Sequence, residues 1–425
     1  MIVWLLLVAA GCWAQSAFKL ISRNRNISAS NYCIYPDSVE TPMTPAPKGK
    51  KPFYLSHYGR HGSRYLNTRK GYDIPYRILS KADSLDKLTP KGQQVLQDLV
   101  LIIRESEGRW GDLTGRGKRQ HRDIARRMMR HFPEVFFGNA RVDARSTTVN
   151  RCILSMASAV QQLVALNPSL RVTMKASKRD MWYMNHQDKG LRKQMGDSVA
   201  MNAYKQFCAS RIHHPRLMGL LFNDSVYARE QVDEQWLCYY LIKTALIQQN
   251  SAIGDKIHLV DLFTDEEIHR FWQCENAWWY FTYGPSPLTG GKQPYSQRFL
   301  LRKLIEDADS CIRLHRPGAQ LRYGHETVLL PLTCLLGING FDFQIDDLEK
   351  LEQTGWWACL VFPMSSNIQI VFYRENPKDK DVLIKVLLNE KETRLPLPDD
   401  LAPYYRWKDF REYYLKKLDA YEAKP

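Results

Sequence analysis

Three short segments of the sequence, 57–64, 146–152 and 323–326, contain side chains that could carry out a reaction. They read HYGRHGSR, STTVNRC and YGHE. Their arginine, histidine and acidic side chains of interest belong to Arg60, His61, Arg64, Arg151, His325 and Glu326. Arginine forks bind phosphate oxygens, an unprotonated imidazole nitrogen is a nucleophile, and a carboxyl group can transfer a proton. Phosphoryl transfer through a phosphohistidine requires this set.

Each residue type has a definite role in such a reaction. His61 would attack the phosphorus atom, and crowding by arginines would keep its attacking nitrogen unprotonated. Three arginines would hold the phosphate oxygens and stabilise charge in the transition state: Arg60, Arg64 and Arg151. His325 would donate a hydrogen bond to the phosphate. Glu326 would protonate the leaving alkoxide and then activate the water that hydrolyses the phosphoenzyme. No metal ion and no cofactor is required.

These segments must be brought together by the elements that precede them. Each follows a run typical of a β-strand: KPFYLSHYG at 51–59, the strand at 142–146, and QLRYG at 320–324. In open α/β sheets the ligand binds beyond the carboxyl ends of the strands. If the strands are parallel neighbours, the six residues meet at one edge of the sheet.

The rest of the chain predicts the fold around that edge. Helical spacing follows Thr89 and Thr114, two expected N-caps, and continues at 148–166. Three further strands are expected at 358–364, 368–374 and 382–388. The fold class predicted is α/β, with a mostly parallel sheet flanked by helices, built from both chain ends and interrupted by an inserted α-helical domain. The expected domains are an α/β catalytic domain at 16–175 and 305–425 and a helical insertion at 176–304.

Composition limits the class of protein. The chain has 425 residues, of which 44% are hydrophobic and 25% charged, proportions that fit a globular protein and exclude long disorder and multi-span membrane architecture. Lys and Arg number 60 against 45 Asp and Glu, so the net charge is +15. Such a charge favours a polyanionic partner: nucleic acid, a membrane surface or a heavily phosphorylated small molecule.

The first fifteen residues predict export. MIVWLLLVAAGCWAQ at 1–15 is uncharged and too short to span a bilayer, so it is expected to be a signal peptide cleaved after Ala14. VAAGC offers the alternative that Cys12 carries a lipid. We therefore expect a periplasmic, secreted or outer-membrane-associated protein with no membrane span. The eight later cysteines form no C-x-x-C pair and are expected to be mostly buried free thiols, with one or two disulfides left open.

The sequence resembles a known family. YGRHGSR, STTVNRCILSMASA and YGHETVLLPL, in this order, are similar to the histidine acid phosphatase superfamily in its phytase and acid phosphatase branch. LLPLTCLLG and SKRDMW resemble the multiple inositol polyphosphate phosphatases in particular. This resemblance implies hydrolysis of inositol polyphosphates such as phytate. It also implies that Lys178 and Arg179, in SKRDMW, contact remote phosphates of the substrate.

Two features depart from that resemblance. The inositol polyphosphate phosphatases typically place their acid two residues after the histidine, as H-A-E, whereas Glu326 follows His325 directly and Thr327 stands at the family position. The arrangement resembles the H-D of bacterial and fungal phytases, so the acid is assigned to Glu326. The C-terminus YEAKP lacks the retrieval signal of animal members, which favours an exported bacterial protein.

Alternative functions remain open at this point. The near alternative is a broad-specificity histidine acid phosphatase, and the more distant one is a non-catalytic relative that keeps the arginines to bind polyanions. Intact His61 and Glu326 argue against the latter, because binding alone needs neither. No nucleic-acid-binding module is recognisable, so no nucleic-acid partner is expected. The sequence gives no oligomeric state.

Overall fold

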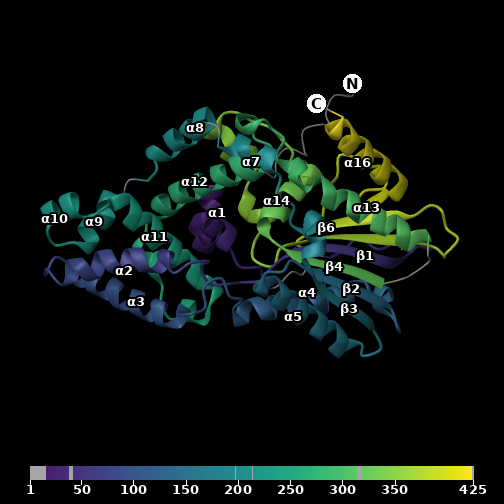
Figure 1. Cartoon of the computed structure of the whole chain (residues 1–425), viewed down its shortest axis with the longest axis horizontal. Coiled ribbons are helices and arrows are strands. Elements are labelled where there is room, and N and C mark those ends of the chain that lie inside the picture. The colour runs from purple at the N-terminus through teal and green to yellow at the C-terminus, as the bar shows by residue number, and fades with distance from the viewer. Residues whose placement is uncertain (1–15, 38–41, 197, 213, 314–317, 424–425) are drawn as a thin grey trace, which may run out of the picture.

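The computed structural model in Figure 1 describes most of the chain after the expected signal peptide. The residues outside the description are 1–15, 38–41, 197, 213, 314–317 and 424–425. The predicted signal peptide and Cys12 therefore lie outside the described residues and stay predictions. Within the described residues, no helix combines the length and apolar character needed to cross a membrane.

A single mixed sheet forms the centre of the α/β part (Figure 1). Its strands are β1 Lys51–Arg60, β2 Arg141–Ser146, β3 Arg171–Ala176, β4 Gly318–Gly324, β5 Asn367–Arg374, β6 Leu383–Leu388, β7 Lys391–Glu392 and β8 Tyr404–Arg406. The order is β3-β2-β4-β1-β5-β6-β7, and β8 also pairs with β6. Pairing is parallel from β3 to β1 and antiparallel from β1 onward. The α/β class is confirmed. The three predicted strand ends belong to β1, β2 and β4, which lie in the parallel half of the sheet.

Two strand predictions differ from the structure. The expected strand at 358–364 is instead the short helix α15 Ala358–Val361, followed by a turn. A short apolar run that is buried on all sides does not distinguish a helix from a strand, so the pattern was ambiguous. The edge strand β3 was not predicted. Most of its side chains are exposed, and it therefore lacks the buried apolar face that identifies a strand.

Helices cover both faces of the sheet (Figure 1). One face packs on α4 Gly115–His131 and α5 Asn150–Leu166, and the other packs on α13 Arg298–Arg313, α14 Glu326–Leu335 and α16 Trp407–Glu422. The hydroxyl group of Thr114 accepts a hydrogen bond from the Gly117 amide at 3.2 Å and caps α4, as predicted. Thr89 caps α3 Pro90–Ser106 in the same way.

A second, helical part adjoins the sheet (Figure 1). Its elements are α1 Ala17–Arg23, α2 Lys70–Asp83, α3, α6 Met181–Met184, α7 Lys189–Met195, α8 Ser198–Ala209, α9 Pro215–Leu221, α10 Ser225–Gln231, α11 Glu234–Ile247 and α12 Asp265–Tyr283. One apolar cluster joins residues from both sides of the expected boundary, including Leu79, Leu99, Leu221 and Leu241. Helices α2 and α3 thus share the core of the helical part although they precede residue 176. The domain limits stay a prediction.

Cysteines of the described chain are mainly buried. Free thiols with little or no exposure are Cys33, Cys152, Cys208, Cys238, Cys274, Cys334 and Cys359. These agree with the expectation of buried thiols, which fill core space as small apolar side chains.

Candidate active site

The three predicted strand ends lie side by side at one edge of the sheet. Arg60, the last residue of β1, pairs in register with Gly324, the last residue of β4. The His61 amide donates to the Gly324 carbonyl at 2.9 Å, and the Thr147 amide donates to the Tyr323 carbonyl at 3.0 Å. Parallel pairing therefore places the residues that follow β1, β2 and β4 next to one another.

The loop after β1 is held closely against two helices. A Cβ atom on Gly62 would lie 2.6 Å from the Gly117 carbonyl oxygen, and one on Gly117 would lie 2.4 Å from the Ser63 carbonyl oxygen, so this approach requires glycine on both sides. The Gly62 amide donates to Ser155 Oγ of α5 at 3.0 Å. The Ser365 amide donates to the His61 carbonyl at 2.9 Å. The backbone of the histidine is consequently fixed before any ligand binds.

The ring of His61 presents one nitrogen to the site. Its Nδ1 atom lies 3.0 Å from the Gly62 carbonyl oxygen, an acceptor, so Nδ1 carries the proton and Nε2 has the lone pair. Burial lowers the pKa of His61 well below its usual value, and Arg60 and Arg151 add to this effect while Glu326 opposes it. The neutral ring therefore has a nucleophilic Nε2.

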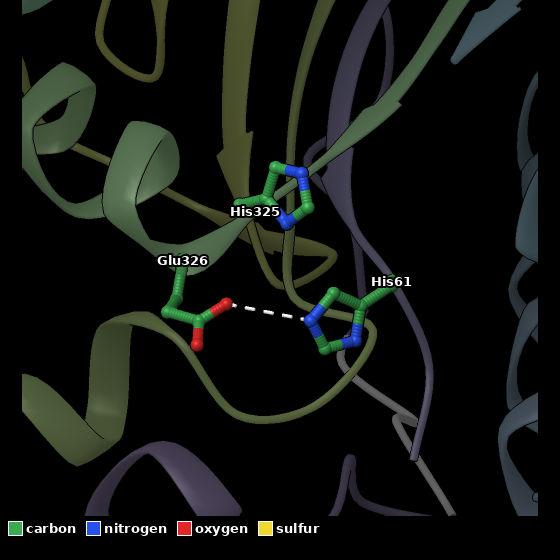
Figure 2. A group of neighbouring side chains, drawn as sticks. All are labelled: His61, His325 and Glu326. Atoms are coloured by element: carbon green, nitrogen blue, oxygen red, sulfur yellow. Dashed lines mark ion pairs between the residues drawn. The ribbon is translucent and has the colours of Figure 1, made fainter. Parts of the chain in front are cut away.

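Glu326 faces this nitrogen (Figure 2). Its Oε2 atom lies 3.4 Å from His61 Nε2 and accepts a hydrogen bond from Arg60 Nε at 3.1 Å. Burial alone would raise the pKa of Glu326, but the charges of Arg60 and Arg64 hold it well below its usual value. The carboxylate of Glu326, the residue directly after His325, therefore lies beside Nε2 of His61.

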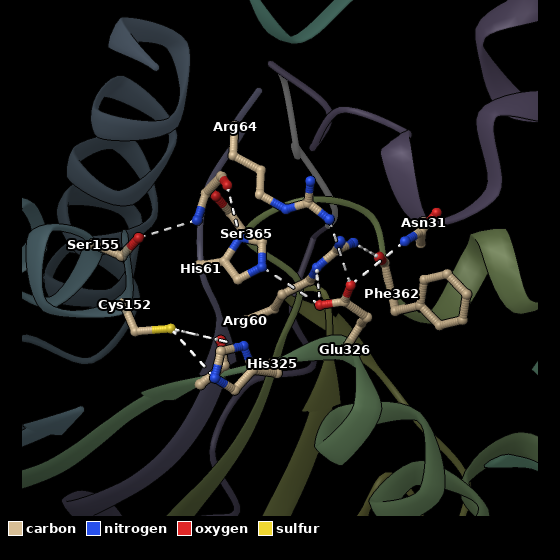
Figure 3. Close-up of polar contacts among 12 residues, drawn as sticks. Asn31, Arg60, His61, Arg64, Cys152, Ser155, His325, Glu326, Phe362 and Ser365 are labelled. Atoms are coloured by element: carbon tan, nitrogen blue, oxygen red, sulfur yellow. Dashed lines mark hydrogen bonds and ion pairs between the residues drawn. The ribbon is translucent and has the colours of Figure 1, made fainter. Parts of the chain in front are cut away.

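Arg60 and Arg64 form a buried cationic pair beside the histidine (Figure 3), and the half-buried Arg151 adds a third charge. Arg60 and Arg64 are 0% and 2% exposed, and burial, despite the opposing Glu326, lowers the pKa of Arg60 to about 10. Burial and the charge of Arg64 lower the pKa of Arg151, on the first turn of α5. Four buried atoms of the site form no hydrogen bond with the described residues: Arg60 Nη2, His61 Nε2, Arg64 Nε and Arg151 Nε. These atoms are available to an anion.

His325 completes the group. Its ring centroid lies 5.8 Å from that of His61, and its Nε2 atom lies 3.2 Å from Thr147 Oγ1. Cys152 Sγ donates to the Gly324 carbonyl and lies 3.8 Å from the same ring nitrogen. Burial lowers the pKa of His325 to about 4, so the ring is neutral near pH 7 and can donate one hydrogen bond.

Lys178 and Arg179 lie apart from this cluster. They belong to the short helix η3 Lys178–Asp180, directly after β3, and both are exposed. Ala176, the last residue of β3, pairs with Ser146, the last residue of β2. Lys178 and Arg179 therefore lie at the same edge of the sheet as the cluster, and β2 separates β3 from β4. Adjacent strands are about 4.8 Å apart, so η3 begins about 10 Å from the end of β4.

Sequence reasoning missed several residues of the site. Asn31 Nδ2 donates to Glu326 Oε1 at 3.4 Å from the N-terminal segment, and Ser155 holds the Gly62 amide (Figure 3). Thr147 and Cys152 contact His325. The segment that includes Arg151 also contains Thr147, Cys152 and Ser155. Their closeness to Arg151 in the sequence could have identified them as residues of the site. No local sequence pattern could have identified Asn31, because the residue it contacts lies 295 positions away.

A metal ion is a poor match for the site. One ligand atom each from His61, His325 and Glu326 lies within 4.8 Å of the others, a spacing that a metal could bridge. The Arg60 and Arg64 guanidinium groups contact the same carboxylate, at 3.1 and 3.9 Å. Three arginines, two of them buried, against one glutamate favour an anion over a cation. A cavity of about 850 Å³, lined by residues such as Cys33, Trp356 and Asn389, includes none of the six cluster residues.

Comparisons with known proteins agree with this geometry. The family model for the histidine phosphatase superfamily (branch 2) matches residues 59–389. The structure resembles the Bifidobacterium longum multiple inositol polyphosphate phosphatase solved with inositol hexasulfate, with a TM-score of 0.77, 16% identity, and coverage of 91% of this chain and 97% of that one. The same enzyme solved with phosphate matches with a TM-score of 0.79 and 15% identity, over 92% of this chain and 98% of that one.

A phytase shows the same fold. The enzyme from D. castellii matches with a TM-score of 0.69 and 12% identity, over 92% of this chain and 85% of that one. A search of curated proteins found no match. The family match covers most of the chain and includes both histidine segments. The chain therefore belongs to branch 2 of the histidine phosphatase superfamily.

Proposed function

We propose that this protein is a metal-independent phosphomonoesterase that hydrolyses inositol polyphosphates, phytate among them, through a phosphohistidine intermediate. One observation carries the proposal: the unprotonated Nε2 atom of His61 lies 3.4 Å from the carboxylate of Glu326, beside the buried Arg60 and Arg64 and the half-buried Arg151. A nucleophile, an acid and phosphate-binding donors are thus within reach of one phosphoryl group.

The reaction proceeds in two steps. His61 Nε2 forms a bond to phosphorus while the P–O bond to the inositol breaks, and protonated Glu326 gives its proton to the leaving oxygen. Glu326, now a carboxylate, then takes a proton from water, whose oxygen attacks phosphorus and releases phosphate and free His61. The arginines Arg60, Arg64 and Arg151 hold the equatorial oxygens in both steps, and His325 donates a hydrogen bond to the phosphoryl group.

Substrate binding allows Glu326 to take up from solvent the proton that the first step needs. Arg60 is the strongest of the groups that hold the pKa of Glu326 well below its usual value. A phosphate anion that binds the guanidinium groups neutralises their charge and competes for the Arg60 Nε donor. The pKa of Glu326 then rises, because opposite charge nearby is what depresses it. The acid form is consequently favoured only when a phosphate is bound.

A substrate with several phosphates agrees with the charges outside the cluster. The net charge of +15 exceeds what one phosphate pocket requires, and Lys178 and Arg179 are exposed at the same edge of the sheet. We infer that they bind phosphates remote from the one being hydrolysed. The Bifidobacterium longum enzyme, which shares the fold, was solved with inositol hexasulfate, an analogue with the same pattern of charge.

A broad-specificity phosphatase is the second candidate, and the same assay separates the two. The purified protein is incubated in EDTA with phytate and with an aryl monophosphate, and kcat/KM is compared. We expect activity in EDTA, a higher kcat/KM for phytate, and phosphate trapped on histidine after rapid quenching. Preference for the aryl ester would favour the broad-specificity enzyme. Binding of phytate without turnover would leave only a polyanion-binding protein.

We also propose that the protein is exported after cleavage behind Ala14, or is anchored to the outer membrane through lipid on Cys12. The support is the uncharged apolar run at 1–15. Sequencing the N-terminus of the mature protein tests this: a start at Gln15 supports simple secretion, a lipid-modified Cys12 supports the anchored form, and an intact Met1 excludes both.

A further inference from the structure

The N-terminal segment reaches the catalytic cluster. It forms η1 Arg25–Tyr32, which packs against α11, α12 and α15. Near its end, Asn31 is 9% exposed, and its Nδ2 atom donates to Glu326 Oε1 at 3.4 Å (Figure 3). A side chain 295 positions away in the sequence thus contacts the carboxyl group that carries the proton.

The backbone directly after Asn31 is held by hydrogen bonds to two other parts of the chain. Asn250 Nδ2 donates to the Tyr32 carbonyl at 2.7 Å, and the Met364 amide donates to the Cys33 carbonyl at 2.7 Å. Gln249 Oε1 accepts from the Ile34 amide at 3.2 Å. These bonds come from the helical part and from the segment after α15, so Asn31 has little freedom to leave the site.

The residue before Asn31 adopts an unusual backbone conformation. Ser30 has φ 52° and ψ −115°, values that a residue with a side chain seldom adopts. Such conformations persist where surrounding contacts impose them, and they are concentrated at functional sites. Here the turn at Ser30 directs the next side chain into the cluster.

The two oxygens of Glu326 have different neighbours. Oε2 accepts from Arg60 Nε and faces His61 Nε2, whereas Oε1 accepts from Asn31 and lies 3.9 Å from Arg64 Nη2. A hydrogen bond to Oε1 fixes the rotation of the carboxyl plane, and so keeps Oε2 directed at the nucleophile and the leaving oxygen. An amide can also accept from a protonated carboxyl group after it flips, which a guanidinium group cannot do.

Resting on the function proposed above, we propose that Asn31 is a positioning residue for proton transfer by Glu326. It acts through the carboxyl group and does not touch the phosphoryl group itself. The other charged or titratable groups that act on Glu326 are Arg60, His61, Arg64, Arg151, His325, Tyr58, Cys152 and Tyr283. Asn31 differs from them because it is uncharged and acts only by orienting the carboxyl group of Glu326.

The test compares Asn31→Leu with wild type on two substrates. Phytate has a strongly basic leaving oxygen that needs a proton, and an aryl monophosphate does not. We expect kcat on phytate to fall about tenfold or more, the scale of one lost hydrogen bond to a charged group, while kcat on the aryl ester changes little. Asn26→Leu, an exposed asparagine of the same segment, is the matched control and should match wild type. Equal losses on both substrates would overturn the proposal.

A double-mutant cycle separates positioning from a structural role. In the Glu326→Gln background, Asn31→Leu should cause no further loss on phytate, because the group it directs can no longer donate a proton in the same way. Additive losses would exclude the proposal. If Glu326→Gln itself shows no dependence on the leaving group, the proposed function fails instead, so the two failures are distinguishable.

A second variant covers the case in which Asn31→Leu does not fold. Asn31→Asp keeps the size of the side chain and places a negative charge beside Glu326, which raises the pKa of its carboxyl group. The alkaline limb of the kcat profile on phytate should therefore move to higher pH. A limb that stays at the wild-type pH would show that Asn31 does not act on Glu326.

Discussion

The Nε2 atom of His61 lies 3.4 Å from the Oε2 atom of Glu326, and the same oxygen accepts a hydrogen bond from Arg60 Nε. A phosphoryl group must enter between these two atoms for the histidine to attack and the glutamate to protonate the leaving oxygen. The carboxylate therefore has to move away from Arg60, and the phosphate takes over that donor. Because His61 and Arg60 are both 0% exposed, this displacement is part of substrate binding.

Replacement of the nucleophile should abolish turnover and spare binding. We expect His61→Ala to lose kcat on phytate by about 10⁴-fold or more, because the covalent path is removed. Binding of inositol hexasulfate, measured by calorimetry, should change little, since the arginines that bind the anion remain. Phosphate bound to histidine should be absent from the quenched variant. Substantial turnover by His61→Ala would exclude the phosphohistidine mechanism.

Loss of the acid should depend on the leaving group. Glu326→Gln should lower kcat on phytate by about 10² to 10⁴, the usual scale for a general acid, with a much smaller loss on an aryl phosphate. Steady-state kinetics on both substrates provide the measurement. Thr327→Ala is the control for the neighbouring position and should have a modest effect. A large loss in Thr327→Ala with an indifferent Glu326→Gln would assign the proton to another group.

The cations after β3 should matter only for substrates with several phosphates. We expect Lys178→Ala and Arg179→Ala each to raise KM for phytate by about threefold to tenfold, since each removes one charged hydrogen-bond donor. KM for an aryl monophosphate should not change. Arg171→Ala, an exposed arginine at the amino end of the same strand, is the matched control. Equal KM values for phytate in all variants would show that these side chains do not contact it.

Buried neutral histidines should make the fold sensitive to acid. Burial lowers the pKa of His57 and of His121 to about 3 and that of His325 to about 4, whereas a histidine in the unfolded chain has a pKa of about 6.5. As the pH falls below 6.5, the unfolded state takes up protons that the folded state does not. The free energy of unfolding therefore decreases, by up to about 1.4 kcal/mol per pH unit for each histidine.

One substitution tests this linkage. Between pH 7 and pH 5, His57→Gln should lose about 2 kcal/mol less stability than wild type, because one histidine no longer titrates on unfolding. Thermal unfolding at the two pH values provides the measurement. His258→Gln, at an exposed position, is the control. An identical pH dependence in wild type and His57→Gln would show that His57 is protonated in the folded protein.

The sequence by itself determined which side chains could carry out the proposed chemistry and which strands place them. Arg60, His61, His325 and Glu326 each follow or end a recognisable strand, and parallel strands place their carboxyl ends at one edge, so their meeting followed from local pattern and general sheet geometry. The N-caps Thr89 and Thr114 were also predictable, because capping is a local interaction.

Only the tertiary structure decided which groups surround that chemistry. The contact of Asn31 with Glu326 and the hydrogen bond from Gly62 to Ser155 join segments far apart in the sequence, and no local pattern encodes them. The segment 358–364 is apolar enough for a strand, but its packing makes it α15 and a turn. The fold also set the surroundings of Glu326, which the sequence proposed as the acid, because its distance from His61 Nε2 and the charges of Arg60 and Arg64 come from separate segments.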